Sequence, residues 1–249
     1  MTRVVLITGA SSGIGDACAR AFSKDGWTCV LAARRRDRVE RLARDLPTES
    51  VAVRLDVTDH DSVLALPAAL ASRVPGIDTL VNNAGLGLGE QRADLADPAD
   101  WVRMIETNVT GLALLTRAVL PTMVQAGGGH VINIGSISAT WPYPTSNVYG
   151  ATKAFVHQFT LNLRADLLRH NIRATVIEPG MTRTEFPTVR NHGDAEAADR
   201  TYAGATPLDP EDVAAAVLWA AQQPAHVNVN SIELMPSCQS FAGLAVDRH

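Results

Sequence analysis

The stretch Val4-Val-Leu-Ile-Thr-Gly-Ala-Ser-Ser-Gly-Ile-Gly15 decides the fold. Residues 3–7 are apolar enough for a buried strand, and helix signals follow over residues 14–24. Gly9, Gly13 and Gly15 permit a tight turn between them and let the backbone approach a pyrophosphate, which a helix N-terminus attracts. Their spacing is G-x-x-x-G-x-G rather than G-x-G-x-x-G, so an ordinary strand-to-helix turn stays open as an alternative.

Three consecutive arginines follow the next predicted strand, residues 28–33. At this position a dinucleotide fold carries an acid for NAD or an arginine for the 2′-phosphate of NADP. No acid stands at the strand end, and cations just before a helix are disfavoured by its dipole. We therefore expect NADP, bound by Arg34 with help from Arg35, and we expect Arg36 and Arg38 to be solvated.

A second stretch carries candidate chemistry. Ser136 follows a predicted strand at 131–134, and ligands of open α/β sheets bind at the carboxyl ends of strands. Tyr149 and Lys153 are four residues apart, on one face of a helix predicted to run to about residue 169. A nearby ammonium draws the pKa of a phenol down from its usual ~10. Ser136 can then bind a carbonyl while Tyr149 transfers its proton, although the Tyr-x-x-x-Lys spacing alone also suits an ordinary amphipathic helix.

Strand and helix signals alternate along the rest of the chain. Strands are predicted at residues 51–55, 77–81, 173–177 and 228–234, and helices at residues 59–73, 98–125 and 210–222. This alternation predicts an α/β fold of the Rossmann type, a doubly wound parallel sheet with helices on both faces, as one domain over residues 1–249. The segment 185–206 is polar and is predicted to be irregular, and it is longer than a compact connection needs, so we expect a substrate loop at about 181–206, and a C-terminal tail at 235–249.

Composition narrows the function classes. The chain has 249 residues and a net charge of −4 without a basic block, which argues against a nucleic-acid partner. It lacks an apolar run of the roughly 18 residues that a membrane span needs. Cys18, Cys29 and Cys238 are odd in number and lack metal-ligand spacing. We expect small buried apolar side chains in a reducing cytoplasm, and no metal site.

Three further polar residues are candidates. Asp56 ends a predicted strand and is placed to meet the adenine amino group. Asn83 could satisfy loop backbone groups beside a cofactor or have a purely structural role. Asn108 lies inside the predicted helix 98–125, where asparagine competes for backbone hydrogen bonds. It marks either a local kink with a water molecule or a harmless polar position.

Taken in order, the motifs resemble the short-chain dehydrogenase/reductase family over nearly the whole chain. They are Thr8-Gly9…Gly13-x-Gly15, Asn82-Asn-Ala-Gly85, Asn108, Ser136, Tyr149-x-x-x-Lys153 and Pro179-Gly180. The resemblance implies that Tyr149 is the general acid/base, that Lys153 holds the nicotinamide ribose and lowers the pKa of Tyr149, and that Ser136 orients the substrate oxygen. It also implies a relay water on Asn108. The implied cofactor residues are Gly9, Ser11, Ser12, Gly13, Ile14, Gly15, Arg34, Arg35, Asp56, Val57, Asn83, Tyr149, Lys153, Pro179, Gly180 and Thr184.

A closer resemblance is to the bacterial NADP-dependent 3-hydroxy acid dehydrogenases. It rests on segments 83–89, 141–143, 147–155, 184–186 and 226–230 and on the tail at 233–243. The resemblance implies a cytoplasmic homotetramer that oxidises small 3-hydroxy acids of the serine, allo-threonine or 3-hydroxypropionate kind, or reduces the matching semialdehyde. Neighbours of this group are sulfoacetaldehyde reductases, which act on a small aldehyde carrying an anion.

Two segments depart from the resembling enzymes, Pro144-Thr-Ser146 and Thr182-Arg183. Our hypothesis is that Arg183 or Arg190 clamps the anionic group of the substrate by charge-assisted hydrogen bonds, with Tyr143 and Ser136 nearby. If both arginines are merely solvated, a neutral or bulky carbonyl becomes the substrate. A non-catalytic dinucleotide-binding sensor is the third reading, and the intact serine, tyrosine and lysine argue against it.

Overall fold

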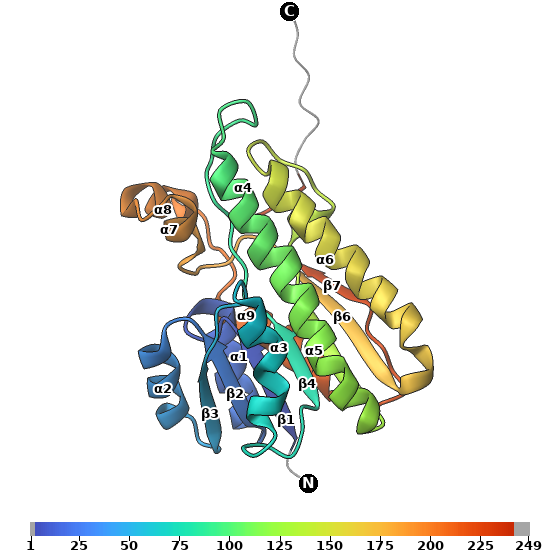
Figure 1. The fold of residues 1–249 in the computed structure, drawn as a ribbon. Helices are drawn as coiled ribbons and strands as arrows, with labels where there is room; N and C mark the ends of the chain where they lie inside the picture. The colour runs from blue at the N-terminus through green and yellow to red at the C-terminus, as the bar shows by residue number, and fades with distance from the viewer. Residues whose placement is uncertain (1–2, 242–249) are drawn as a thin grey trace, which may run out of the picture.

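The computed structural model describes residues 3–241. Its centre is a parallel sheet of seven strands in the order β3-β2-β1-β4-β5-β6-β7 (Figure 1). The strands are β1 (Val4–Thr8), β2 (Thr28–Ala33), β3 (Ser50–Arg54), β4 (Thr79–Asn82), β5 (Gly129–Ile134), β6 (Ile172–Pro179) and β7 (Ser231–Leu234). The predicted fold class is therefore confirmed. Successive strands are added to one side of β1 up to β3, and from β4 onward they are added to its other side. Ligands of such sheets bind in the crevice at this point, between β1 and β4.

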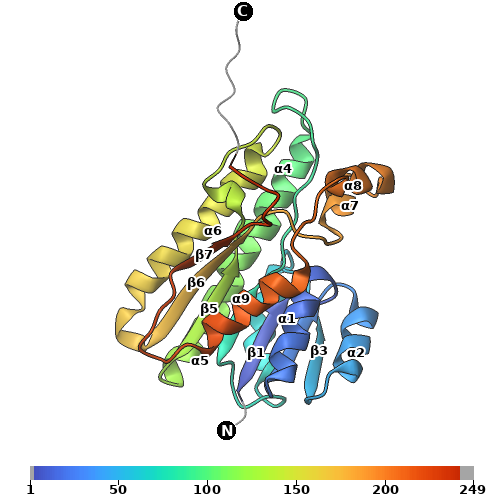
Figure 2. The ribbon, with the colours of Figure 1, turned by 180° about the vertical axis from the view of Figure 1, so that it is seen from behind.

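Helices cover both faces of the sheet, which explains why the inner strands are almost continuously apolar. Phe22 and Val217 belong to the core on one face, and Leu115 and Met123 belong to the core on the other. The first layer holds α1 (Gly13–Lys24), α2 (Arg36–Asp45) and α9 (Pro210–Gln222), with α1 packed against α9 (Figure 2). The second layer holds α3 (His60–Leu70), α5 (Leu112–Gln125) and α6 (Asn147–Asp166).

The predicted helix at 98–125 is helical throughout but is interrupted in its hydrogen bonding. It consists of α4 (Pro98–Ile105), a π-helical turn (Glu106–Gly111) and α5. Asn108 lies in the π-helical turn and is 1% exposed. Such turns inside α-helices are frequent at functional sites. Of the two readings of Asn108, the structure therefore shows the local distortion.

The segment 181–206 is more regular than expected. It contains α7 (Phe186–Arg190) and α8 (Ala195–Tyr202), so the expectation of an irregular stretch from 185 to 206 is wrong. Asp194 caps α8, because its carboxylate accepts a hydrogen bond from the Ala197 amide. Both short helices stand at the carboxyl ends of the strands, apart from the two main helix layers (Figure 1).

Smaller expectations also change. The helix predicted to reach residue 169 ends at Asp166 and is followed by a 3₁₀ turn (Leu168–His170). Cys18 and Cys29 are buried as expected, but Cys238 is exposed. Residues 242–249 of the predicted tail lie outside the described residues. Within the described part of the chain, no helix combines the length and apolar character needed to span a membrane.

Candidate functional site

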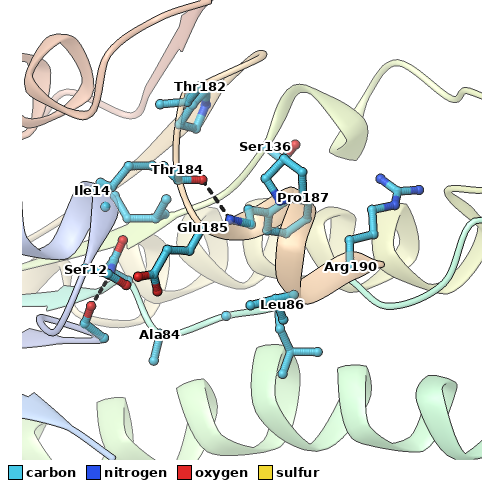
Figure 3. A pocket seen from close by; sticks show the side chains of 18 of the residues that line it. Ser12, Ile14, Ala84, Leu86, Ser136, Thr182, Thr184, Glu185, Pro187 and Arg190 are labelled. Atoms are coloured by element: carbon cyan, nitrogen blue, oxygen red, sulfur yellow. Dashed lines mark hydrogen bonds between the residues drawn. The ribbon is translucent and has the colours of Figure 1, made fainter. Parts of the chain in front are cut away.

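A cavity of about 710 Å³ lies at the carboxyl ends of the strands and brings together most of the predicted site residues. Those in its wall are Gly9, Ser11, Ser12, Gly13, Ile14, Arg34, Arg35, Asp56, Val57, Asn83, Ser136, Tyr143, Tyr149, Lys153, Pro179, Gly180, Thr184 and Arg190. In Figure 3, Ser12 and Glu185 lie toward one end of this cavity and Arg190 toward the other, with Ser136 between them. Gly15, Asn108 and Arg183 are not in the wall.

The turn after β1 requires its glycines. Gly9 and Gly13 have φ of +65° and +54°, values that favour glycine. A Cβ at Gly15 would collide with the carbonyl oxygen of Gly9, so the turn closes only without a side chain there. Asn83 Nδ2 donates to the carbonyls of Thr8 and Gly9 at 2.9 and 3.4 Å. Asn83 therefore satisfies the loop backbone, and the turn presents bare backbone at the N-terminus of α1.

The arginines after β2 differ in their surroundings. Arg35 donates to Ser11 Oγ at 3.1 and 3.0 Å and to Ser12 Oγ at 2.7 Å, which ties it to the glycine turn. Arg34 lies in the cavity wall and is exposed. Arg36 pairs with Glu40 at 2.6 Å, outside the cavity. Arg38 is not simply solvated as expected, because its guanidinium contacts Glu185 at 2.7 Å.

The wall beyond β5 holds Ser136, Tyr149 and Lys153. Ser136 begins a 3₁₀ turn, with its Oγ accepting from the Ser138 amide at 3.2 Å. Tyr149 and Lys153 extend from α6, and Lys153 Nζ lies 5.9 Å from the centre of the Tyr149 ring. Lys153 Nζ also donates to the Ile134 carbonyl at 2.8 Å. Ser136 and Lys153 are buried, at 8% and 7% exposure, so their polar atoms act with little competition from water.

The pKa of Tyr149 departs from the sequence-based expectation. Burial raises it above the ordinary value, the neighbouring Tyr143 adds to the rise, and a hydrogen bond with Ser136 and the charge of Arg190 only partly oppose it. Burial also lowers the pKa of Lys153 to about 8. The chain's own groups thus keep the Tyr149 phenol protonated at neutral pH, ready to give a proton.

Asn108 lies outside the cavity wall and bonds segments that border the site. Its Oδ1 accepts from the Leu86 amide at 2.9 Å, and its Nδ2 donates to the Leu86 carbonyl at 2.7 Å and to Thr152 Oγ1 at 3.1 Å. These bonds fix the loop after β4 against α6, one residue from Lys153. The π-helical turn is what brings this side chain into position. The relay water implied for Asn108 stays a prediction.

The two candidate substrate arginines separate clearly. Arg183 is 60% exposed, pairs with Asp209 at 3.5 Å and stays outside the cavity wall. The side chain of Arg190 is 11% exposed. Its Nη1 donates to Tyr143 Oη at 3.1 Å and its Nε donates to the Gly89 carbonyl at 3.3 Å. Of the two, Arg190 is the one that faces the cavity (Figure 3).

Backbone strain marks the end of the cavity at which Arg190 lies. Thr145, within 3.4 Å of Arg190, has φ of +69°, which is strained for a β-branched residue. Strain of this kind gathers at functional sites. In the substrate loop, Tyr202 Oη donates to the Thr182 carbonyl at 2.7 Å and accepts from the Thr184 amide at 3.2 Å, which closes the loop on itself.

Two residues of this site carry no recognisable sequence signal. Glu185 contacts arginines that lie about 150 positions away, and Tyr202 sits in a polar stretch with no apolar periodicity. Asp56, which the sequence did indicate, is in the cavity wall, and its Oδ1 accepts from the amide and hydroxyl of Thr58 at 3.1 and 2.9 Å. Its contact with adenine stays a prediction.

Known proteins resemble this chain in sequence and in fold. The model of the short chain dehydrogenase family matches residues 3–195. The NADP-dependent 3-hydroxy acid dehydrogenase YdfG of Salmonella typhi is 49% identical over 246 residues, which is 98% of this chain and 99% of that protein. Sulfoacetaldehyde reductase 2 of Chromohalobacter salexigens is 48% identical, with 100% of both chains covered. The closed form of a serine dehydrogenase complexed with NADP⁺ superimposes with a TM-score of 0.96 at 47% identity, covering 99% of this chain and 100% of that one.

Proposed function

Because this chain belongs to the short-chain dehydrogenase family, we propose that it is an NADP(H)-dependent oxidoreductase that interconverts a small 3-hydroxy acid and the matching semialdehyde. One observation carries the proposal. A single cavity joins the glycine turn and Arg35, through Ser136, Tyr149 and Lys153, to the largely buried Arg190. Cations at both ends with a proton donor between them suit a phosphorylated cofactor and an anionic substrate meeting at the phenol.

The residues fit a phosphorylated dinucleotide. The glycine turn leaves backbone exposed at the N-terminus of α1, a position that attracts phosphate, and Arg34 and Arg35 stand beside it. Pro179, Gly180 and Thr184 also line the cavity, and the family resemblance assigns Thr184 to the nicotinamide side of the cofactor. When bound, NADP(H) accepts or supplies the hydride, while the protein contributes position and electrostatics.

The chain's own residues handle the substrate oxygen and its proton. Ser136 donates a hydrogen bond to that oxygen, and Tyr149 gives it a proton during reduction or takes the proton back during oxidation. Lys153 holds the nicotinamide ribose, and the charge of its buried ammonium favours the phenolate that remains after proton release. Asn108 ties α6, which carries Tyr149 and Lys153, to the loop after β4.

We expect Arg190→Ala to raise KM for an anionic semialdehyde at least about tenfold with a smaller change in kcat, because a hydrogen bond to a charged group contributes about 1.5–3 kcal/mol. Arg183→Ala is the matched control and stays within about twofold of the parent, because Arg183 lies outside the cavity wall. Steady-state kinetics on both variants make the comparison. An unchanged KM in Arg190→Ala would favour a neutral carbonyl substrate instead.

A second prediction concerns cofactor choice. Arg34→Asp and Arg35→Ala each lower kcat/KM for NADP⁺ by about tenfold or more and leave the value for NAD⁺ nearly unchanged, because only NADP⁺ carries the 2′-phosphate. Arg36→Ala serves as control, since Arg36 pairs with Glu40 away from the cavity. If the ratio of kcat/KM for NADP⁺ to kcat/KM for NAD⁺ is the same in all three variants as in the parent, these arginines do not bind the 2′-phosphate.

A sulfonate is a specific alternative to a carboxylate as the anionic group of the substrate. The similarity to a sulfoacetaldehyde reductase matches that to the 3-hydroxy acid dehydrogenase, and a guanidinium such as Arg190 binds carboxylate and sulfonate alike. Sulfoacetaldehyde is therefore the second candidate substrate. Comparing kcat/KM for sulfoacetaldehyde and malonic semialdehyde decides between them.

The proposal includes a cytoplasmic homotetramer. Val102 and Ile105 on α4 and Phe155 on α6 are apolar side chains that remain exposed on two helices packed against each other. Exposed apolar side chains gathered on neighbouring helices favour association. Size-exclusion chromatography with light scattering is expected to give four times the 26.5 kDa chain mass, and a monomeric mass would contradict this part of the proposal.

A further inference from the structure

Glu185 bridges two segments that the sequence keeps far apart. Its Oε2 accepts from Arg35 Nη1 at 2.8 Å, and its Oε1 accepts from Arg38 Nη1 at 2.7 Å. Arg35 uses its other nitrogens on the hydroxyls of Ser11 and Ser12. The carboxylate therefore occupies the one Arg35 nitrogen, Nη1, that does not bond the glycine turn.

The Glu185 carboxylate is charged at all ordinary pH values. Partial burial acts to raise its pKa, but the hydrogen bonds and charges of Arg38 and Arg35 outweigh that effect and bring the pKa down to about 2. Both partners are about 40% exposed, so water weakens the pairing. A stronger anion can thus replace this carboxylate.

The position of Glu185 connects the two ends of the cavity. It directly precedes α7, the helix of the substrate loop, and α7 ends at Arg190. In Figure 3, Glu185 points to the side of Ser12, whereas Arg190 points to the opposite side. What holds Glu185 therefore also holds the short helix that carries the proposed substrate arginine.

We propose that Glu185 is an internal anion that occupies Arg35 in place of a 2′-phosphate, and that NADP(H) displaces it and so frees the start of α7. This inference rests on the proposed NADP specificity and assigns a specificity-determining role to a further residue. A carboxylate and a phosphate dianion repel one another and compete for the same guanidinium donors. NAD(H) has a neutral hydroxyl at that position and leaves the Glu185 contact in place.

The test uses the full-length protein and two fragments of the cofactor. Adenosine 2′,5′-bisphosphate carries the 2′-phosphate without the nicotinamide, and ADP lacks it. In Glu185→Gln, calorimetry is expected to show about fivefold tighter binding of the bisphosphate, because a competing exposed charge pair is gone, and binding of ADP within about twofold of the parent. Glu40→Gln is the matched control, since Glu40 pairs with Arg36 outside the cavity and changes neither affinity.

Hydrogen exchange gives a second readout, independent of affinity. In the parent protein, the bisphosphate is expected to speed amide exchange at residues 184–192, whereas ADP leaves it unchanged. Ligand-free Glu185→Gln should already exchange at the faster rate. Equal exchange with both ligands would contradict the release of α7.

The outcomes separate this inference from the proposed function. If the parent binds the bisphosphate no better than ADP, the proposed NADP specificity fails and the inference fails with it. If the parent prefers the bisphosphate but Glu185→Gln binds it equally or more weakly, only the inference is overturned. Glu185 would then be a support that positions Arg35 for the phosphate rather than its competitor.

Discussion

Tyr149→Phe is expected to reduce a semialdehyde with a kcat at least about a thousandfold below that of the parent, while its Kd for NADPH stays within about twofold. The variant loses only the hydroxyl, which we propose to be the proton donor and which hydrogen-bonds with Ser136 in the cavity wall. General acid catalysis contributes about 10²- to 10⁴-fold, and we propose no other side chain among residues 3–241 as its replacement. Single-turnover kinetics with preformed enzyme–NADPH complex isolate this step.

Tyr143→Phe is the matched control for Tyr149→Phe. It also removes one phenolic hydroxyl from the cavity wall, but that hydroxyl accepts from Arg190. We expect its effect to fall mainly on KM and its kcat to stay within about tenfold of the parent. If Tyr149→Phe keeps a kcat in that same range, Tyr149 is not the acid.

Lys153→Met is expected to be more stable than the parent at pH 7 and at least about a hundredfold less active. The pKa of Lys153 falls from 10.5 to about 8 because the ammonium is buried, a shift that corresponds to about 3 kcal/mol. Loss of the hydrogen bond to the Ile134 carbonyl costs about 1 kcal/mol, which leaves a net gain of about 2 kcal/mol. The lysine therefore destabilises the fold in exchange for function.

The stability difference between Lys153→Met and the parent depends on pH, because Lys153 can be charged or neutral. Below pH 8 the lysine is charged in both the folded and the unfolded chain, so the full burial penalty applies. Between pH 8 and 10.5 the folded chain sheds the proton first, so the stability of the parent rises and the advantage of Lys153→Met shrinks. Urea unfolding of both proteins from pH 7 to 10.5 measures this difference in the free energy of unfolding.

Lys24→Met is the control for Lys153→Met, because Lys24 is the other lysine of the chain and is exposed. Its free energy of unfolding should follow that of the parent at every pH. A Lys153→Met variant that is less stable than the parent at pH 7, or whose difference from the parent is the same at all pH values, would contradict the burial argument.

Local patterns in the sequence predict the fold well where one segment decides its own structure. β2 spans residues 28–33 as expected, and α9 starts at Pro210 after Asp209, whose side chain and that of Asp212 form a capping box. The site residues directly after strands, such as Ser136, follow from the rule that parallel strands end at one edge. These features depend on residues that are neighbours in the sequence, so they can be predicted from it.

Features that depend on distant contacts are not predictable in this way. Asn108 lies in a π-helical turn and accepts a hydrogen bond from the Leu86 amide, and only the folded chain brings these two residues together. Arg183 and Arg190 look alike in sequence, but α7 turns one of them inward. The pKa of Tyr149 rises rather than falls because burial outweighs a neighbouring cation, and burial is a property of the whole fold.

The most direct test of the account follows nicotinamide absorbance with the purified protein, NADP⁺ or NAD⁺, and a panel of serine, 3-hydroxypropionate, 3-hydroxyisobutyrate and isethionate. We expect NADPH to form with at least one 3-hydroxy acid, and NADP⁺ to be used in preference to NAD⁺. If NADP⁺ binds, as seen by a change in the tryptophan fluorescence of the protein, but no alcohol of the panel produces NADPH, the protein is a dinucleotide-binding sensor rather than a dehydrogenase of these compounds.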